Sequence, residues 1–343
     1  MISLRLRTST LLSFALLLIL ACQIPAISTS AVEPTTTPVA STPTNISIPT
    51  ATLIPGETPT EAPTAIPQPA FQATRVLILS IDGLRPDAIA LAPMPNLLEL
   101  MKTGAFTMNA QTVYRSVTLI SHASMLTGSC PSKHGVYWND YLPLLGYAQG
   151  TDIFDLAHAD GLQTVMYVGK EKMVQLTEPS SVDIYRYIND RDLVIAEELI
   201  AEFPQDFGVL FIHFPLVDGM GHEHGWLSPQ QLSVAFRADE ALGLILAELD
   251  ARDLRDETLI IITADHGGSG TSHGSDSTED MTIPWIAAGP GIQPGHLTSP
   301  VNTMDTAATA AFVLGLPIPD EWDGVPVYEA FGLPMEEQST ACQ

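Results

Sequence analysis

Short apolar runs rich in β-branched residues most strongly constrain how this chain can fold. They have the length of buried strands and lie at 75–81, 162–168, 207–214, 258–263 and 283–288. Stretches of helical composition lie between and after them, at 189–203, 228–250 and 305–315. Strands that alternate with helices form parallel sheets that the helices cover. We therefore expect an α/β fold with a largely parallel sheet and helices on both faces.

The first 22 residues predict an export signal. Arg5 and Arg7 precede an apolar core at 11–20 that is too short for a good membrane span. A small residue followed by Cys22 resembles the bacterial lipobox, which implies cleavage before Cys22 and lipidation of that cysteine. An ordinary signal peptide that happens to contain a cysteine is the alternative. On the first interpretation the protein is exported and is anchored by lipid at the cell surface or in the periplasm.

Residues 23–73 consist mainly of Pro, Thr, Ser and Ala and carry almost no charge. Such a segment cannot bury enough apolar surface to offset its loss of conformational entropy, so we expect a disordered stalk. Residues 74–332 are long enough for one sizeable core. We expect them to form a single folded domain, followed by a tail at 333–343.

The formal net charge of −25 limits the classes of partner. A broad nucleic-acid interface is not expected, because phosphate backbones bind basic surfaces. Small anionic substrates remain compatible with this charge if metal ions reverse its sign locally. Beyond Cys22 only Cys130 and Cys342 remain, so one disulfide bond outside the cell and two free thiols are both open alternatives.

Acid and imidazole side chains follow three of the apolar runs. The clusters are Asp82, the pair Asp218 and His222, and the pair Asp265 and His266 with His273 seven residues further on. We expect each cluster in a loop at the end of a strand, where open α/β sheets build their sites. Three aspartates and three histidines at one sheet edge suit two divalent metal ions, with zinc as the leading candidate.

Two of these assignments leave alternatives open. Asp82 stands before a glycine, and a lone carboxylate in that position is more often a helix N-cap than a metal ligand. Glu223 and His224, next to His222, offer alternative ligands. The adjacent pair Asp265-His266 is the most specific signal, because neither a core nor a solvated surface explains it.

Thr118 is the candidate nucleophile. Residues 119–127 have helical composition, and Gly128 is expected to end this helix. Thr118 then lies at the helix N-terminus, where backbone N–H groups and the dipole favour a phosphate or an alkoxide. A threonine hydroxyl is a poor nucleophile until a metal ion promotes its deprotonation. A simple helix cap at Thr118 is the alternative.

In their order and spacing these residues resemble the alkaline phosphatase superfamily, and most closely its type I phosphodiesterase/nucleotide pyrophosphatase branch. The resemblance covers most of 74–332 and implies an alkaline-phosphatase-like catalytic domain with two bound zinc ions. It places Asp82, Thr118, Asp265 and His266 on one ion and Asp218, His222 and His273 on the other. It also implies an extracytoplasmic hydrolase of small phosphoric esters that acts through a phospho-threonine intermediate.

Asn139 matches the family asparagine that helps to hold the phosphoryl oxygens. A neutral donor suits that role, because it stabilises developing charge without a counter-ion. A turn-forming asparagine beside Asp140 is the alternative. The segment from Cys130 to Lys133 looks like a sulfatase motif, but the modified residue of sulfatases occupies the nucleophile position, which here is Thr118. A sulfatase is therefore not expected.

Lys170 and Lys172 complicate the choice of substrate. Two residues apart on an extended segment, their ammonium groups would point the same way. The pair resembles the Lys-x-Lys of phosphate monoesterases and phosphonoacetate hydrolases of the superfamily, which implies a clamp for a dianionic phosphoryl group. Ordinary surface lysines in a solvated turn are the alternative.

An inactive binding module of the same fold is a further alternative. The filled ligand positions argue against it, because degenerate relatives usually lose several. We expect a small phosphoric ester as the partner and no membrane contact beyond the N-terminal lipid anchor.

Overall fold

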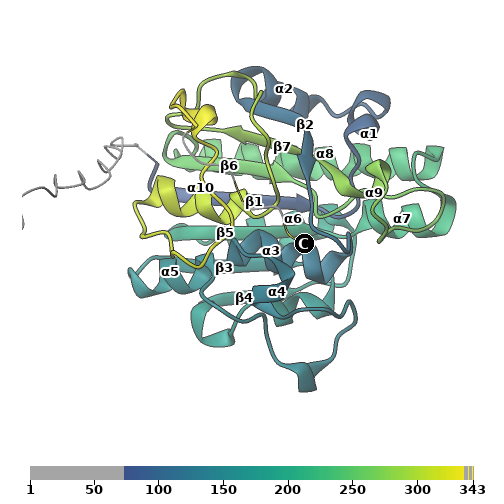
Figure 1. Cartoon of the computed structure of the whole chain (residues 1–343). Helices are drawn as coiled ribbons and strands as arrows, with labels where there is room; N and C mark the ends of the chain where they lie inside the picture. Colours follow the sequence, from purple (N-terminus) through teal and green to yellow (C-terminus); the bar gives the residue numbers. More distant parts are fainter. Residues whose placement is uncertain (1–72, 336–338, 340–341, 343) are drawn as a thin grey trace, which may run out of the picture. The chain divides into compact units, whose positions relative to one another are not determined.

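An eight-stranded sheet organises the described part of the chain, residues 73–335, 339 and 342 of this computed structural model (Figure 1). The strand order is β4-β3-β5-β1-β6-β7-β2-β8. β7 runs antiparallel to both of its neighbours, and every other pair is parallel. The expected α/β fold with a largely parallel sheet is confirmed. The predicted export signal at 1–22 and stalk at 23–73 lie outside the described residues, except for Ala73.

The strands are short. They are β1 (Arg75–Ile81), β2 (Ala105–Gln111), β3 (Gln163–Val168), β4 (Ile184–Tyr187), β5 (Phe207–Phe214), β6 (Thr258–Thr263), β7 (Thr282–Ala288) and β8 (Gly295–His296). The five predicted strands are confirmed to within one residue at each end. The sequence pattern does not predict β2, β4 and β8, because β2 mixes polar with apolar residues and the other two are very short.

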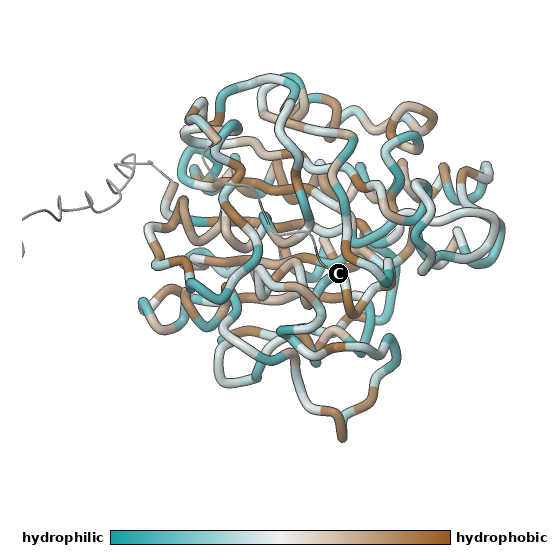
Figure 2. The backbone as a smooth tube through the Cα atoms, viewed as in Figure 1, coloured by the Kyte–Doolittle hydropathy of each residue, from teal (hydrophilic) through white to brown (hydrophobic). Residues whose placement is uncertain are grey.

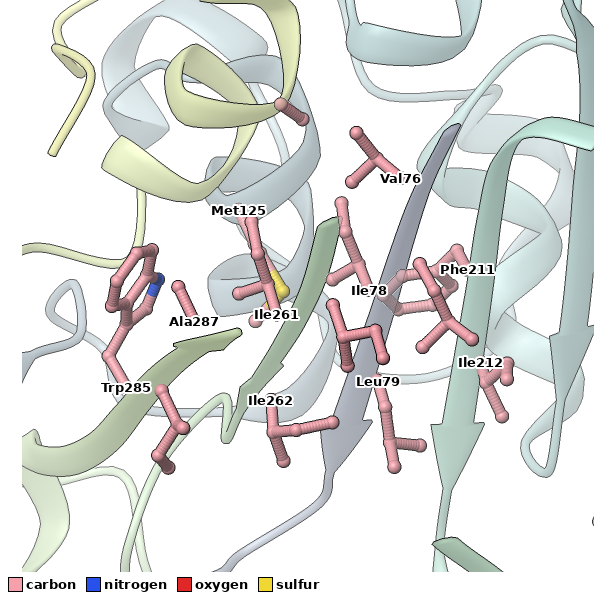
Figure 3. Packing of buried hydrophobic residues seen from close by; sticks show 14 of the residues in the cluster. Val76, Ile78, Leu79, Met125, Phe211, Ile212, Ile261, Ile262, Trp285 and Ala287 are labelled. Atoms are coloured by element: carbon pink, nitrogen blue, oxygen red, sulfur yellow. The ribbon is translucent and has the colours of Figure 1, made fainter. Parts of the chain in front are cut away.

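Largely apolar sequence keeps the central strands β1, β5 and β6 buried on both faces. Ile78 of β1 lies level with Phe211 of β5 on one side and with Ile261 of β6 on the other (Figure 3). Each large apolar side chain buried in this way contributes about 1.5–3 kcal/mol. The centre of the sheet is therefore a firm base for the loops at its edge.

Helices cover both faces of the sheet (Figure 1). One face carries α3 (Thr118–Thr127), α5 (Ile153–Ala159) and α10 (Asp305–Leu314), and the other carries α2 (Pro95–Thr103), α6 (Asp192–Ala201) and α8 (Pro229–Ala251). The shorter helices are α1 (Pro86–Leu91), α4 (Pro131–His134), α7 (Leu216–His224) and α9 (Thr278–Met281). The 3₁₀ turns are η1 (Pro143–Leu145), η2 (Glu171–Leu176), η3 (Pro179–Ser181), η4 (Arg255–Glu257) and η5 (Tyr328–Phe331). The three predicted helices are confirmed as α6, α8 and α10.

Cys130 and Cys342 form a disulfide bond, which resolves the alternative that the sequence left open. Cys342 belongs to the segment predicted as a tail, and in the same segment the Ser339 hydroxyl lies 3.5 Å from Asp305 Oδ2. The described residues of this segment therefore contact the domain. No helix in the described ranges is both long and apolar enough to cross a membrane.

Candidate active site

The carboxyl ends of four neighbouring strands bring the candidate residues together at one edge of the sheet. Lys170 follows β3, Asp218 follows β5, Asp82 follows β1 and Asp265 follows β6, and these strands are adjacent in the order β3-β5-β1-β6. Adjacent parallel strands end at the same edge, so residues far apart in the sequence become neighbours there.

Asp82 is fully buried just past the end of β1. Its Oδ2 accepts hydrogen bonds from Lys170 Nζ at 2.7 Å and from His213 Nε2 at 2.8 Å. Burial acts to raise the pKa of Asp82, but the charge of Lys170 and the bond from His213 outweigh it and hold the pKa well below its ordinary value. The helix-cap alternative is wrong, because the next helix, α1, begins only at Pro86 and has Arg85 at its N-cap.

Asp265 and His266 leave β6 in a fully buried bend. Asp265 Oδ1 accepts the backbone N–H of Gly83 at 3.1 Å and that of His266 at 3.0 Å. Its Oδ2 lies 3.3 Å from His266 Nε2. Burial and then the charge of Asp82 raise the pKa of Asp265 well above its ordinary value. The described side chains therefore supply less positive charge than these carboxylates need.

Asp218 and His222 lie on helix α7, so the prediction of a loop for this cluster is wrong. Residues four apart on a helix share a face, and His222 Nε2 accordingly lies 3.3 Å from Asp218 Oδ1. His224 turns instead toward Glu223, at 3.4 Å. Of the two imidazoles that the sequence offers here, His222 is the one that reaches the site.

Three imidazoles turn the same ring nitrogen toward the centre of the site. The Nδ1 of each faces a backbone carbonyl oxygen, which can only accept, so Nδ1 carries the proton. The distances are 3.0 Å from His222 to Thr271, 2.7 Å from His266 to Gly267 and 2.9 Å from His273 to Ser116. The three Nε2 atoms therefore present lone pairs, an arrangement typical of metal-ligating histidines.

These lone pairs face one another and the carboxylates rather than donors. His222 Nε2 and His273 Nε2 are 3.1 Å apart, and Asp218 Oδ1 lies 3.5 Å from His273 Nε2. In the described chain, the buried atoms Asp82 Oδ1, Asp218 Oδ1, Asp265 Oδ2 and His266 Nε2 have no hydrogen-bond partner. Facing acceptors repel unless a cation lies between them, so the residues present fit bound divalent metal ions.

The ligand atoms fall into two overlapping groups, each with its atoms within 4.8 Å of one another. One comprises Asp218, His222 and His273, and the other Asp82, Asp218 and His266. The first group coincides with one predicted ligand set. The second shares Asp82 and His266 with the other predicted set, but among the acidic and imidazole side chains Asp218 takes the place of Asp265. Metal binding by Asp265 and Thr118 stays a prediction.

Thr118 is buried and is the first residue of α3. Val117 occupies the N-cap position, so the alternative that Thr118 caps the helix is wrong. Thr118 Oγ1 instead lies 3.4 Å from Lys170 Nζ. Gly128 ends α3 as predicted, in the left-handed conformation with a φ of 60°, where a Cβ atom would lie 2.6 Å from the ring of Trp322.

Asn139 and Lys172 lie together beside the start of α3. Asn139 Oδ1 accepts the Leu119 N–H at 2.9 Å and a hydrogen bond from Lys172 Nζ at 2.9 Å. With its oxygen engaged, the asparagine has its amide NH₂ left to donate. Burial and then the charge of Lys170 lower the pKa of Lys172 to about 8.

Lys170 lies between the two groups of ligands. Its Nζ is 2.6 Å from Asp218 Oδ2 as well as 2.7 Å from Asp82 Oδ2. Burial acts to lower the pKa of Lys170, but the two carboxylates raise it above its ordinary value. The extended geometry expected for the lysine pair is wrong, because Lys170 is the N-cap of η2 and Lys172 lies within η2. Both ammonium groups reach the site through different partners, which two solvated surface lysines would not do.

Two buried histidines of the site escaped the sequence analysis. His213 Nδ1 accepts the Gly169 N–H at 3.3 Å. The proton of the ring is therefore on Nε2, which donates a hydrogen bond to Asp82. His122 Nδ1 donates to the Thr118 carbonyl at 2.7 Å. A lone imidazole in the aliphatic run 207–214 was the available signal, because a buried polar ring requires partners.

Asp192 lies behind α7 and supports its start. Its buried Oδ1 accepts the backbone N–H of Leu216, the first residue of α7, at 3.2 Å. Its Oδ2 is buried without a hydrogen-bond partner among the described atoms. Burial raises the pKa of Asp192 to about 7.

We expect Asp192→Asn to weaken the pH dependence of stability. In the unfolded chain this carboxyl ionises near pH 4, but in the folded protein only near pH 7. Its contribution to stability is therefore present below about pH 4 and is lost as the pH rises to about 7, by up to about 4 kcal/mol. Urea unfolding at pH 4 and pH 8 measures this loss, which should be smaller in the variant. Asp190→Asn, at an exposed position two residues earlier, is the control. An equal loss of unfolding free energy in the parent protein and in both variants would contradict the assignment.

Comparison with known proteins supplies independent information. A sequence profile of the family described as "Type I phosphodiesterase / nucleotide pyrophosphatase" matches residues 76–283. The catalytic subunit of GPI ethanolamine phosphate transferase 2 from Homo sapiens is 31% identical over 303 residues, 80% of this chain and 30% of that protein. Bis(5'-adenosyl)-triphosphatase enpp4 from Xenopus laevis is 26% identical over 245 residues, 63% of this chain and 50% of that protein. The chain spans half or less of the length of these curated relatives.

Among solved structures, murine ectonucleotide pyrophosphatase/phosphodiesterase 5 in complex with AMP matches with a TM-score of 0.63. The match covers 75% of this chain and 98% of that one, at 17% sequence identity. A match at this identity establishes a common fold.

Proposed function

Because the chain belongs to the type I phosphodiesterase/nucleotide pyrophosphatase family of the alkaline phosphatase superfamily, we propose that it is a metal-dependent hydrolase of phosphoric esters. The proposed enzyme acts outside the cytoplasm on small phosphodiesters or pyrophosphates, through a phospho-threonine at Thr118. The relatives are named as a triphosphatase, a nucleotide pyrophosphatase/phosphodiesterase and an ethanolamine phosphate transferase. Chemistry at a phosphoryl centre is common to these names.

One observation carries the proposal: acceptor atoms from three strand ends converge, and in the described chain Asp82 Oδ1, Asp218 Oδ1, Asp265 Oδ2 and His266 Nε2 are buried there without a hydrogen-bond partner. An unsatisfied buried polar atom costs about 1–3 kcal/mol, so a module without metal would gain nothing from burying several of them together. The complete set of ligand positions also argues against an inactive binding module.

We assign Asp82, Asp265 and His266, together with Thr118, to one metal ion, and Asp218, His222 and His273 to the other. Zinc is the leading candidate, because imidazole and carboxylate ligands suit it. Two divalent ions bound there would polarise the phosphoryl group and offset the charge on the attacking and leaving oxygens.

The chain's own residues then have defined tasks. The Thr118 hydroxyl gives up its proton to solvent and its Oγ1 forms a bond to phosphorus as the bond from phosphorus to the leaving oxygen breaks, and the leaving group takes up a proton from solvent. Lys170 Nζ, 3.4 Å from Oγ1, favours the deprotonated hydroxyl. The amide of Asn139 donates to a non-bridging oxygen. Water attacks the same phosphorus in the second step, and Thr118 regains its proton as the phosphoryl product leaves.

The proposed location follows the sequence. We propose an export signal at 1–22 with lipid on Cys22, a stalk at 23–73, a catalytic domain at 74–332 and a tail at 333–343. The disulfide bond between Cys130 and Cys342 supports an oxidising compartment.

We expect purified, active protein to hold about two divalent metal ions per chain. Chelation should abolish turnover, and stoichiometric zinc should restore it. His222→Ala should lose about one of the two ions in elemental analysis and in zinc titration of the metal-free protein. His224→Ala is the matched control. His224 turns toward Glu223, so this variant should keep both ions. Activity of metal-free protein would contradict the proposal.

We expect Thr118→Ala to lower kcat by at least about three orders of magnitude, because the change removes the nucleophile. Thr118→Ser keeps a hydroxyl and should retain a measurable rate. Thermal unfolding of both variants checks that the site stays folded. A nearly fully active Thr118→Ala protein would leave Thr118 with a structural role alone.

The two lysines favour a second candidate function, a phosphate monoesterase or phosphonoacetate hydrolase-like activity. Lys170 and Lys172 bring two ammonium groups into the site, 3.4 Å from Thr118 Oγ1 and 2.9 Å from Asn139 Oδ1. Two point charges suit a doubly charged phosphoryl group better than a singly charged diester.

If the lysines clamp a dianion, Lys170→Ala/Lys172→Ala should lower kcat/KM on a phosphate monoester at least about a hundredfold, because two charge-assisted contacts are lost. Turnover of a diester should fall less, because it loses the effect of Lys170 on Thr118 but no contact with a second phosphoryl charge. The ratio of the two activities carries the test, and the exposed Lys102→Ala variant should leave it unchanged. Equal losses on both substrates would return the assignment to a phosphodiesterase in which the lysines do not hold the substrate.

A further inference from the structure

A convex apolar tip projects from the domain beside the candidate active site. We call Leu142–Leu145, which contain η1, the apolar tip. Leu144 is 99% exposed and Leu145 is 53% exposed. This segment forms the projection at the bottom of Figure 1, and its end is hydrophobic in Figure 2. Five of the eleven large apolar side chains exposed in the described chain lie within 141–147.

A buried glutamine, Gln175, fixes the base of this projection, which we call the neck: the two backbone segments around Leu142 and Gly146. Gln175 Nε2 donates to the carbonyl oxygens of Leu142 at 2.8 Å and Gly146 at 2.7 Å. Its Oε1 accepts the N–H of Leu142 at 2.8 Å. Gln175 is only 1% exposed, so the glutamine side of each of these bonds is buried. The apolar tip is therefore a built projection and not a loose loop.

The same short helix connects the apolar tip to the candidate active site. η2 carries both Gln175 and Lys172, and Lys172 bonds to Asn139, which lies three residues before the tip. The tip and the proposed phosphoryl site therefore share one support.

We propose that the apolar tip inserts into the interface of a zwitterionic phospholipid bilayer and holds the active site next to the lipid headgroups. Its leucines point outward, and Tyr141 and Tyr147 flank them at the neck, the level at which aromatic rings lie in membrane interfaces. Residues 141–151 carry no charge. A stable protein interface buries about 800 Å² on each partner, and a tip of four residues offers no flat face of that size.

Charge around the apolar tip selects the kind of bilayer. A hollow of about 690 Å³ on its C-terminal side is lined by four acidic residues, Asp152, Asp155, Glu178 and Glu321. Burial raises the pKa of Asp152 to about 7, so the other three carry most of the negative charge. An anionic surface would be repelled, so neutral headgroups are favoured. A few leucines alone give weak, reversible binding, and the lipid proposed at Cys22 supplies the second attachment. The domain then contacts the membrane itself, which revises the expectation of contact through the anchor alone.

Site-directed fluorescence tests the insertion directly. An environment-sensitive dye is attached in the full chain through Leu144→Cys or, as the control, through Leu98→Cys on α2, which lies at the opposite end of Figure 1. Both proteins carry Cys22→Ser, so that the introduced thiol alone reacts, and vesicles are present in large excess, so that the weak binding by the leucines alone is populated. With phosphatidylcholine vesicles, emission from position 144 should shift to the blue and be quenched by an acyl-chain quencher, whereas position 98 should not respond. No response at 144, or equal responses at both positions, overturns the proposal.

A matched pair of double variants measures the contribution of the leucines in the same background. Leu144→Gln/Leu145→Gln should weaken vesicle binding about tenfold or more per leucine, whereas Leu91→Gln/Leu98→Gln should not change it. Tighter binding to anionic than to phosphatidylcholine vesicles overturns the headgroup assignment.

Turnover of a soluble phosphoric ester separates this inference from the proposed function. Both double variants should match the parent protein. A loss of kcat/KM confined to the tip variant would make the tip a substrate contact and overturn the membrane assignment. A parent protein without turnover would contradict the proposed function. The fluorescence result would still decide whether the tip contacts the membrane.

Discussion

The candidate site depends on one constraint: the four strands β3, β5, β1 and β6 run parallel, side by side, and end at the same edge. Buried apolar side chains of the central strands pack side by side and hold these ends in register. Ile78, for example, lies level with Phe211 on one side and with Ile261 on the other. The carboxylates that follow the strands therefore cannot move apart to relieve their repulsion. Their negative charge must be offset by cations, and the side chains of the described residues offset only part of it.

Lys170 is the resident cation at this edge. Its ammonium group contacts both Asp82 and Asp218 and lies near Thr118 Oγ1. One ammonium group balances one carboxylate, and Asp265 remains without that compensation in the same buried space. This imbalance is the physical reason why a strongly acidic protein can hold an anionic phosphoryl group in the proposed mechanism. The attraction is confined to the site, while the surface of the domain repels larger polyanions.

Much of the fold and most of the candidate site could be predicted from the sequence, because both depend on strongly patterned segments. Buried parallel strands are continuously aliphatic, and the residues after them gather at one edge whatever the details of the loops. Local conformation was harder. The glycines around Asp218 favoured a loop, but packing of α7 against α8 holds the segment helical. His213 and Gln175 escaped notice because their partners, Asp82 and the neck of the apolar tip, are contacts that sequence spacing cannot show.

The disulfide bond orders the events of folding. Cys342 follows Cys130 by 212 residues, and every strand and helix after α3 lies between the two cysteines. The bond can therefore close only after all strands of the sheet have been synthesised and have reached an oxidising environment. Until then only hydrogen bonds and packing hold the sheet. In the native protein, the covalent link ties the segment that begins at α4 and leads to Asn139 to the residues that follow η5. Reduction would thus loosen the approach to Asn139 from a point outside the catalytic cluster.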